Sequence, residues 1–286
     1  MTKLLCATDL LPKSEAAIDR AGLLAQRLGA QLSLLHVVSP VSSERNLEQS
    51  LQMAIAGLDA RARAPLWRFG PPPNVAVRTG SPARLIRETI DEQRPDLLIV
   101  GPHRKRGVRD VLEGTLAEKI LSTRQCPLLM VRDKADAEYR NMLLALDLAE
   151  ESGAAVRAAE ALVLGPSTQA MVMHVCEPPY QGMMRSAGVA SEDVVAYVDD
   201  SRREAADQVR NLLKQASTDH ARYAVVIGEH HPAASIRRAI ELYQPDLVVM
   251  GTSGMGRMRR ALIGSVANQI LDAATCDVLV VPRGSA

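Results

Sequence analysis

Aromatic residues and excess charge are both scarce in this chain. Its 286 residues include one Trp, one Phe and five Tyr, and its formal net charge is +1. Proteins that bind single-stranded nucleic acid stack the bases on aromatic side chains and attract the backbone with positive charge. We therefore expect no nucleic-acid partner.

Cysteine motifs and long apolar runs are also missing. The four cysteines form no Cys-x-x-Cys pair, so we interpret them as buried structural thiols and not as redox or metal-binding groups. The adjacent His230 and His231 have no further ligand at zinc spacing, and we interpret them as loop residues. No apolar run approaches the roughly 20 residues that span a membrane, and Asp9 comes too early for a signal peptide. These features predict a cytoplasmic protein with no membrane partner.

The chain contains two copies of one unit. Pro-Asp-Leu-Leu-Ile-Val-Gly at 95–101 returns as Pro-Asp-Leu-Val-Val-Met-Gly at 245–251. Other residues return in the same order, so that Asp9 matches Asp147, His36 matches His174 and Gly114 matches Gly264. We predict two tandem domains, 1–133 and 139–286, each with enough apolar residues for its own core. The charged segment 133–139, which has no apolar period, is the predicted linker.

Short apolar runs alternate with segments of helix length in both halves. The predicted strands are 3–8, 31–38, 74–78, 96–100 and 127–131, then 142–146, 169–176, 223–227, 247–250 and 278–281. Their nearly continuous apolar character is typical of strands that are buried on both faces of a parallel sheet. Between them, 47–66 has apolar residues at three- and four-residue intervals and is predicted to be a helix. The predicted fold class is α/β, with a doubly wound parallel five-stranded sheet in each half.

A glycine pattern follows the fourth strand of the second half. Gly251 and Gly254 are separated by two residues, and nine residues further on Gly264 and Ser265 open a helix. Glycines allow the backbone to approach a ligand closely, and consecutive N–H groups can surround an anion. A helix N-terminus adds free N–H groups and partial positive charge, which suit phosphate.

With this Gly-x2-Gly-x9-Gly-Ser pattern behind a buried strand, the chain resembles the universal stress protein family. The resemblance covers both halves almost end to end, and the layout is similar to the tandem, E-type branch. It implies an adenine nucleotide α-hydrolase-like fold with strand order 3-2-1-4-5. It also implies ATP, held where the strand order reverses.

The resemblance implies roles for individual residues of the second half. Asp147 would contact the ribose or adenine, and the backbone of Val175 would meet the adenine edge. Ala145 stands where family members usually have proline, two residues before the Asp. The remaining contacts would line the ribose and phosphate path: Met250, Gly251, Gly254, Gly264, Ser265 and Val266.

The first half departs from the pattern at one position. Its matching residues are Asp9, Val37, Gly101, Gly114 and Thr115. Arg104, however, stands where the second glycine belongs, and a non-glycine residue at positive φ costs of order 1 kcal/mol or more. We predict a degenerate site here, with an altered but functional site as the alternative.

Binding is better supported than catalysis. The chain has no Gly-x4-Gly-Lys-Ser/Thr loop, and a single carboxylate, Asp147, is weak support for a magnesium site. We predict a stress-response binder or sensor of ATP, with or without Mg²⁺. The alternatives are a slow ATPase and a module for an apolar or anionic small molecule.

Two further points stay open from the residues alone. Segment 177–190 has two methionines and no counterpart in the first half, and we predict that it is a mobile loop. It is either a lid over the second crevice or an exposed insertion. Tandem fusion predicts an intramolecular pseudo-dimer of the two domains. Whether the whole chain also forms a homodimer is not decided by the sequence.

Overall fold

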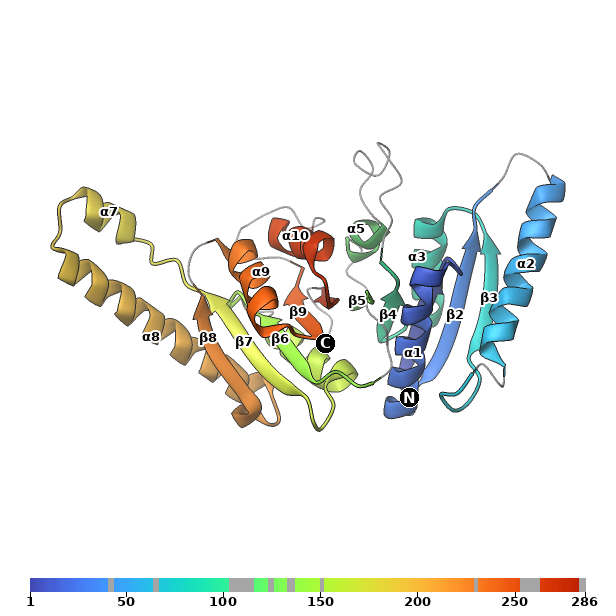
Figure 1. Cartoon of the computed structure of the whole chain (residues 1–286), viewed down its shortest axis with the longest axis horizontal. Coiled ribbons are helices and arrows are strands. Elements are labelled where there is room, and N and C mark those ends of the chain that lie inside the picture. The colour runs from blue at the N-terminus through green and yellow to red at the C-terminus, as the bar shows by residue number, and fades with distance from the viewer. Residues whose placement is uncertain are drawn as a thin grey trace.

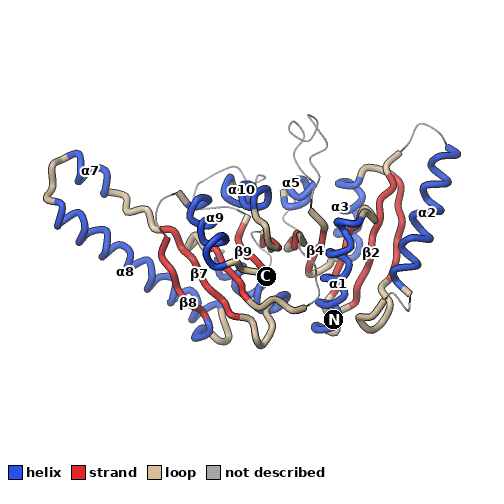
Figure 2. Tube along the Cα trace, viewed as in Figure 1, coloured by secondary structure: helices blue, strands red, loops and turns tan. Residues whose placement is uncertain are grey.

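The structure is a computed structural model that describes residues 1–40, 44–63, 67–102, 116–122, 126–132, 137–149, 152–228, 231–252 and 263–282. Two halves of similar build stand side by side, and each is a twisted sheet with helices packed on it (Figures 1 and 2). The last strand of the chain lies at the boundary between the halves.

Strands and helices alternate along both halves. The first contains β1 (Lys3–Thr8), a short 3₁₀ turn (Pro12–Ser14), α1 (Glu15–Leu28), β2 (Gln31–Val38), α2 (Glu44–Ala62), β3 (Asn74–Thr79), α3 (Pro82–Gln93), β4 (Leu97–Val100), α5 (Leu116–Leu121) and β5 (Leu128–Met130). The second contains β6 (Asn141–Ala145), α6 (Ser152–Ala158), a π-helical turn (Ala159–Val163), β7 (Gln169–Val175), α7 (Gln181–Ser186), α8 (Ser191–Ala216), a 3₁₀ turn (His220–Arg222), β8 (Tyr223–Gly228), α9 (Pro232–Tyr243), β9 (Leu247–Gly251), α10 (Ser265–Ala273) and β10 (Asp277–Val281).

The described strands form one ten-stranded sheet in the order β3-β2-β1-β4-β5-β10-β9-β6-β7-β8. Within each half the strands pair in parallel and follow the order 3-2-1-4-5, which confirms the predicted fold class. The halves join where β5 pairs antiparallel with β10, with Leu129 opposite Leu279. Because of this antiparallel joint, the carboxyl ends of the strands in the two halves lie at opposite edges of the shared sheet.

Alternating side chains of the strands fill two core layers, one on each face of the sheet. In β4, Leu97 and Ile99 belong to one layer, and Leu98 and Val100 belong to the other. The first layer includes residues of α1, α2, α6 and α8, and the second includes residues of α3, α5, α9 and α10. Each layer contains residues of both halves. Both halves contribute the apolar residues that the sequence predicted, and the paired edges let both layers continue across the joint.

A buried polar cluster holds the halves together at this joint. The Tyr139 hydroxyl donates to Asp277 Oδ2 at 2.7 Å, and Arg20 Nε of α1 lies 3.5 Å from the same oxygen. The Arg20 guanidinium also stacks on the Tyr139 ring, 3.9 Å from its centroid, and the Arg132 backbone N–H donates to Asp277 Oδ1 at 2.7 Å. Burial and the neighbouring Asp277 raise the pKa of Tyr139 well above its ordinary value. The predicted charged linker thus ends in a buried residue, although 133–136 lie outside the described residues.

The helices α2 and α8 occupy equivalent places but differ in length. α2 has 19 residues and buries Ala54, Leu58 and Ala62, in agreement with the predicted apolar stripe, of which 64–66 lie outside the described residues. α8 has 26 residues. Among the described helices, none combines the length and apolar character that a membrane span requires.

Segment 177–190 contains a helix, so the prediction of a plain loop was wrong. α7 packs against the first part of α8, and the pair projects away from the body of the second half as an arm (Figure 1). The Tyr180 backbone N–H lies 3.4 Å from the Tyr197 hydroxyl, and the two rings are 6.3 Å apart. The helix forms here because α8 supplies a surface for it, which the local sequence does not reveal.

Candidate functional site

The candidate site lies at the carboxyl ends of β6 and β9. β6 pairs with β7 on one side and with β9 on the other, so the strand order reverses at β6. Sheets of this kind bind ligands in the crevice at such a switch point. Ala145 is paired with Met250. Asp147 and Thr252 therefore each lie two residues beyond this pair.

Asp147 forms a tight turn at the end of β6. Its Oδ1 accepts hydrogen bonds from the Ala149 N–H at 3.1 Å and from the Ser152 hydroxyl at 2.6 Å. Leu148 has φ +59°, a left-handed conformation that costs a non-glycine residue roughly 1–2 kcal/mol. Asp147 Oδ2 is buried and has no hydrogen-bond partner among the described residues. One carboxylate oxygen is therefore used to hold the turn, and the other is available to a donor.

The first half repeats this turn. Asp9 Oδ1 accepts from the Leu11 N–H at 3.0 Å and from the Ser14 hydroxyl at 2.6 Å, and Leu10 also has φ +59°. Strained backbone of this kind is kept where the surrounding structure enforces it, often at binding sites. Both halves therefore have the turn that would present a carboxylate to the crevice.

In each of the two matched histidines, a hydrogen bond to the backbone fixes the orientation of the ring. Nδ1 of His174 lies 2.8 Å from the Leu146 carbonyl oxygen, and Nδ1 of His36 lies 2.8 Å from the Thr8 carbonyl oxygen. A carbonyl oxygen only accepts, so Nδ1 carries the hydrogen in both residues. The bond ties the second strand of each half to the end of its first strand, which is a structural role.

On the other side of the crevice, the chain leaves β9 and returns to start α10. The Gly264 N–H donates to the Thr252 carbonyl oxygen at 2.6 Å, which places the N-terminus of α10 beside the end of β9. Gly264 is the N-cap residue and has no side chain to bind the first N–H groups of the helix. Thr252 is 4% exposed, and its Oγ1 has no hydrogen-bond partner among the described residues. Gly254 lies outside the described residues.

The space beside the first glycine differs between the halves. A Cβ added to Gly251 would meet no described heavy atom within 4 Å. A Cβ added to Gly101 would lie 2.8 Å from Ser14 Oγ and 3.1 Å from Ser14 Cα. Among the described residues nothing fills this point of the second crevice, whereas the turn before α1 narrows the first one.

The predicted residues of the second half lie mostly where the sequence analysis expected them. Asp147, Val175 and Gly251 are at the carboxyl ends of β6, β7 and β9, and Gly264 and Ser265 are at the start of α10. Met250 lies at the end of β9 as well, and because its side chain is buried in a core layer, only its backbone is left to line a crevice. Val266 likewise packs against the core with its side chain.

In the first half, Asp9, Val37 and Gly101 also lie at the carboxyl ends of strands or just beyond them. Arg104, Gly114 and Thr115 lie outside the described residues, so the effect of Arg104 stays a prediction. Sequence reasoning missed the contribution of Thr252. A comparison of the two copies contains the signal, because Pro102 takes the place of Thr252 after the matching glycine.

The groups considered for metal or redox chemistry are dispersed. Within the described ranges, no cluster of three His, Cys, Asp or Glu side chains is placed to hold a metal ion. Cys6, Cys126 and Cys276 are buried, and Cys176 is half-buried. Burial raises the pKa of Cys6 and of Cys126 to about 12. His230 lies outside the described residues, and His231 precedes α9 as its N-cap residue.

Two doubly wound halves on one sheet, each with an Asp turn at its switch point, define a tandem α/β protein. The model of the universal stress protein family matches residues 1–132 and 138–282. The chain therefore belongs to the universal stress protein family.

Curated relatives correspond to about half of this chain. Universal stress protein Sll1388 of Synechocystis is 26% identical over 153 residues, which are 50% of this chain and 97% of the relative. Universal stress protein A homolog 1 of Coxiella burnetii is 29% identical over 142 residues, 45% of this chain and 94% of the relative. Each relative is therefore the size of one of the two units.

A solved structure matches the whole chain. The universal stress protein from Archaeoglobus fulgidus aligns with a TM-score of 0.74 and 17% identity, and the alignment covers 99% of this chain and 96% of that one. At this identity the likeness shows the fold, which includes both halves.

Proposed function

We propose that this chain binds ATP or a related adenine nucleotide in the crevice of its second half and acts in the cytoplasm as a stress-response binder or sensor. One observation carries the proposal. Two buried oxygens, Asp147 Oδ2 and Thr252 Oγ1, lack partners among the described residues at the switch point, beside the helix N-terminus at Gly264. A buried polar atom without a partner costs about 1–3 kcal/mol, so a ligand that donates or shares hydrogen bonds with these two oxygens would recover that cost.

The chemistry of these groups fits a nucleotide. A carboxylate only accepts hydrogen bonds, and ribose hydroxyl groups donate them, so Asp147 would hold the sugar. The first N–H groups of α10, from Ser265 onward, would receive phosphate oxygens with the help of the helix dipole. Gly251 and Gly254 would let the ligand approach the backbone, and the backbone of Val175 would meet the base.

The first half would serve as a pseudo-symmetric partner without a nucleotide. Its Asp9 turn is intact, but Ser14 fills the space beside Gly101. Pro102 also lacks the hydroxyl of Thr252. Together with Arg104, these differences support a degenerate first site.

The test is a calorimetric titration of the full-length protein with ATP, with and without Mg²⁺. We expect one site per chain. Two sites would show that Arg104 is accommodated, and no binding would favour the apolar or anionic small molecule. Release of inorganic phosphate in the same samples would identify the slow ATPase.

Gly264→Asp separates phosphate binding from folding. Aspartate is a good N-cap residue, so the helix should form as before, while its charge repels phosphate. We expect ATP affinity to fall at least about tenfold, which is about 1.4 kcal/mol. The matched control is Gly114→Asp in the first half, with affinity unchanged. Equal affinity of Gly264→Asp and the wild-type protein would remove the proposal.

A further inference from the structure

The arm of the second half, residues 177–203, stands largely outside the two core layers. Farther along α8, Val209 and Leu213 belong to the core layer on the sheet. Val194 and Val198 in the arm are buried as well, but they belong to neither layer. α7 packs on this part of α8, away from the sheet (Figure 1). One face of the arm helix is thus covered by α7, and the opposite face is not.

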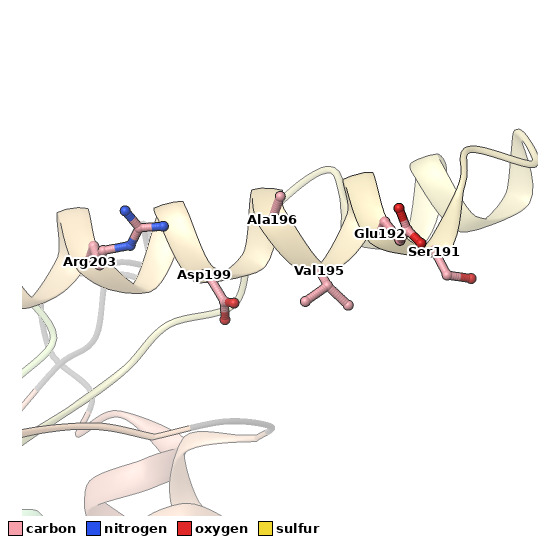
Figure 3. A pocket seen from close by; sticks show the side chains of 6 residues that line it. All are labelled: Ser191, Glu192, Val195, Ala196, Asp199 and Arg203. Carbon is pink, nitrogen blue, oxygen red and sulfur yellow. The ribbon is translucent and has the colours of Figure 1, made fainter.

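The arm carries exposed apolar side chains. On the uncovered face of α8, Val195 is 58% exposed, and on the α7 segment Tyr180 and Met183 are 57% and 63% exposed. A shallow groove runs along α8 and is lined by Ser191, Glu192, Val195, Ala196, Asp199 and Arg203. Val195 and Asp199 point to the same side of the helix (Figure 3). Exposed apolar side chains gathered on a projecting element mark an interaction surface.

The charges along α8 indicate which partner this surface fits. Its first ten residues, 191–200, contain four acidic residues and no basic one. The following residues, 201–214, contain four basic and two acidic residues. A helix with an acidic start and a basic continuation is complementary to itself when a second copy lies antiparallel. In that arrangement Glu192 of each helix faces Arg203 of the other, and Val195 and Ala196 lie between the two ion pairs.

Arg203 is able to take such a partner. It lies 2.8 Å from Asp200 of its own helix, but both side chains are more than two thirds exposed. An exposed pair of this kind contributes little stability and leaves the guanidinium accessible to a second carboxylate. The inner edge strands of the two halves are already paired with each other, β5 with β10, so a second copy must dock elsewhere.

We propose that this chain forms a two-fold symmetric homodimer through antiparallel packing of the arm helices α8, with Glu192 of each chain paired with Arg203 of the other. Such a contact is isologous, because the same surface serves both chains and the assembly closes at two. The inference does not depend on nucleotide binding, since the arm surface and the crevice share no residue.

The experiment measures the mass of the full-length protein in solution by light scattering after size exclusion, over a concentration series and without nucleotide. We expect twice the chain mass of 30.9 kDa for the wild-type protein. Glu192→Arg and Arg203→Glu should each shift the protein to the monomer, because each brings like charges together. The double variant, which exchanges the two charges, should restore the dimer.

Matched controls apply the same charge changes to α9. Arg238 and Glu241 are exposed residues of α9, away from the arm. The Glu241→Arg and Arg238→Glu proteins should therefore stay dimeric. A monomeric wild-type protein overturns the proposal, and so does a dimer that neither arm variant weakens. A double variant that stays monomeric overturns the antiparallel pairing of Glu192 with Arg203.

Discussion

Two buried threonines in the second half provide a test that separates a ligand site from ordinary packing. Thr252 and Thr168 are both 4% exposed. Thr168 Oγ1 donates to the Tyr139 carbonyl oxygen at 2.7 Å and accepts from the Gly165 N–H at 2.9 Å. Thr252 Oγ1 has no partner in the described part of the chain. Replacement of each by valine keeps the shape and removes the hydroxyl.

The two changes should move the free energy of unfolding in opposite directions. Thr168→Val leaves two buried backbone groups unpaired and should lower the stability by about 1–3 kcal/mol. Thr252→Val removes a hydroxyl that is buried without a partner, and should raise the stability of the ligand-free protein by about 1 kcal/mol. Urea denaturation without nucleotide measures both values.

The same pair should differ in nucleotide binding. If the Thr252 hydroxyl contacts the ligand, Thr252→Val loses one hydrogen bond, about 0.5–1.5 kcal/mol, and ATP affinity falls about 2- to 10-fold. Thr168 precedes β7 at the opposite edge of the sheet, so Thr168→Val should leave the affinity unchanged. A Thr252→Val protein that is less stable than the wild type, or that binds ATP equally well, refutes the reasoning.

Two further predictions concern buried charge and buried thiols. Asp277→Ala removes the acceptor of the Tyr139 hydroxyl and the carboxylate beside the buried Arg20 guanidinium, and should cost about 3–5 kcal/mol in urea denaturation. Asp207→Ala removes an exposed ion pair and should cost at most about 1 kcal/mol; equal losses would contradict the role of the joint. Because burial raises the pKa of Cys6 to about 12, its reactive thiolate is absent near neutral pH. Iodoacetamide should therefore modify the half-buried Cys176 first in the native protein, and mass spectrometry that finds Cys6 labelled earlier would contradict this.

The fold could be predicted because its signals are local and occur twice. Buried parallel strands such as β4 and β9 are apolar runs; Gly101 follows β4, and Gly251 ends β9. The place of Asp9 and Asp147 was also foreseeable, since Asp9 directly follows β1 and Asp147 follows β6 after one residue. Such features depend on residues close together in the chain, so the sequence displays them.

The candidate site was only partly predictable. The sequence indicates Gly251 and Gly264, but the bond from Gly264 to Thr252 closes a loop whose path no local pattern describes. The contact of Ser14 with Gly101 joins residues far apart in the chain, and it makes the first crevice narrower at this point. The difference between the crevices therefore involves more than Arg104, the one departure that the motif revealed.

The sequence by itself determined that this protein has two α/β units, which segments are strands, and which residues follow them. Tertiary structure decided how the units combine. β5 and β10 are apolar runs much like the other strands, and nothing in them indicates that they pair with each other in opposite directions. The cluster of Arg20, Tyr139 and Asp277 and the packing of α7 on α8 likewise bring together groups from separate segments. Pairing and packing of this kind depend on surfaces that exist only after the strands and helices have come together, which is why they could not be read from the chain alone.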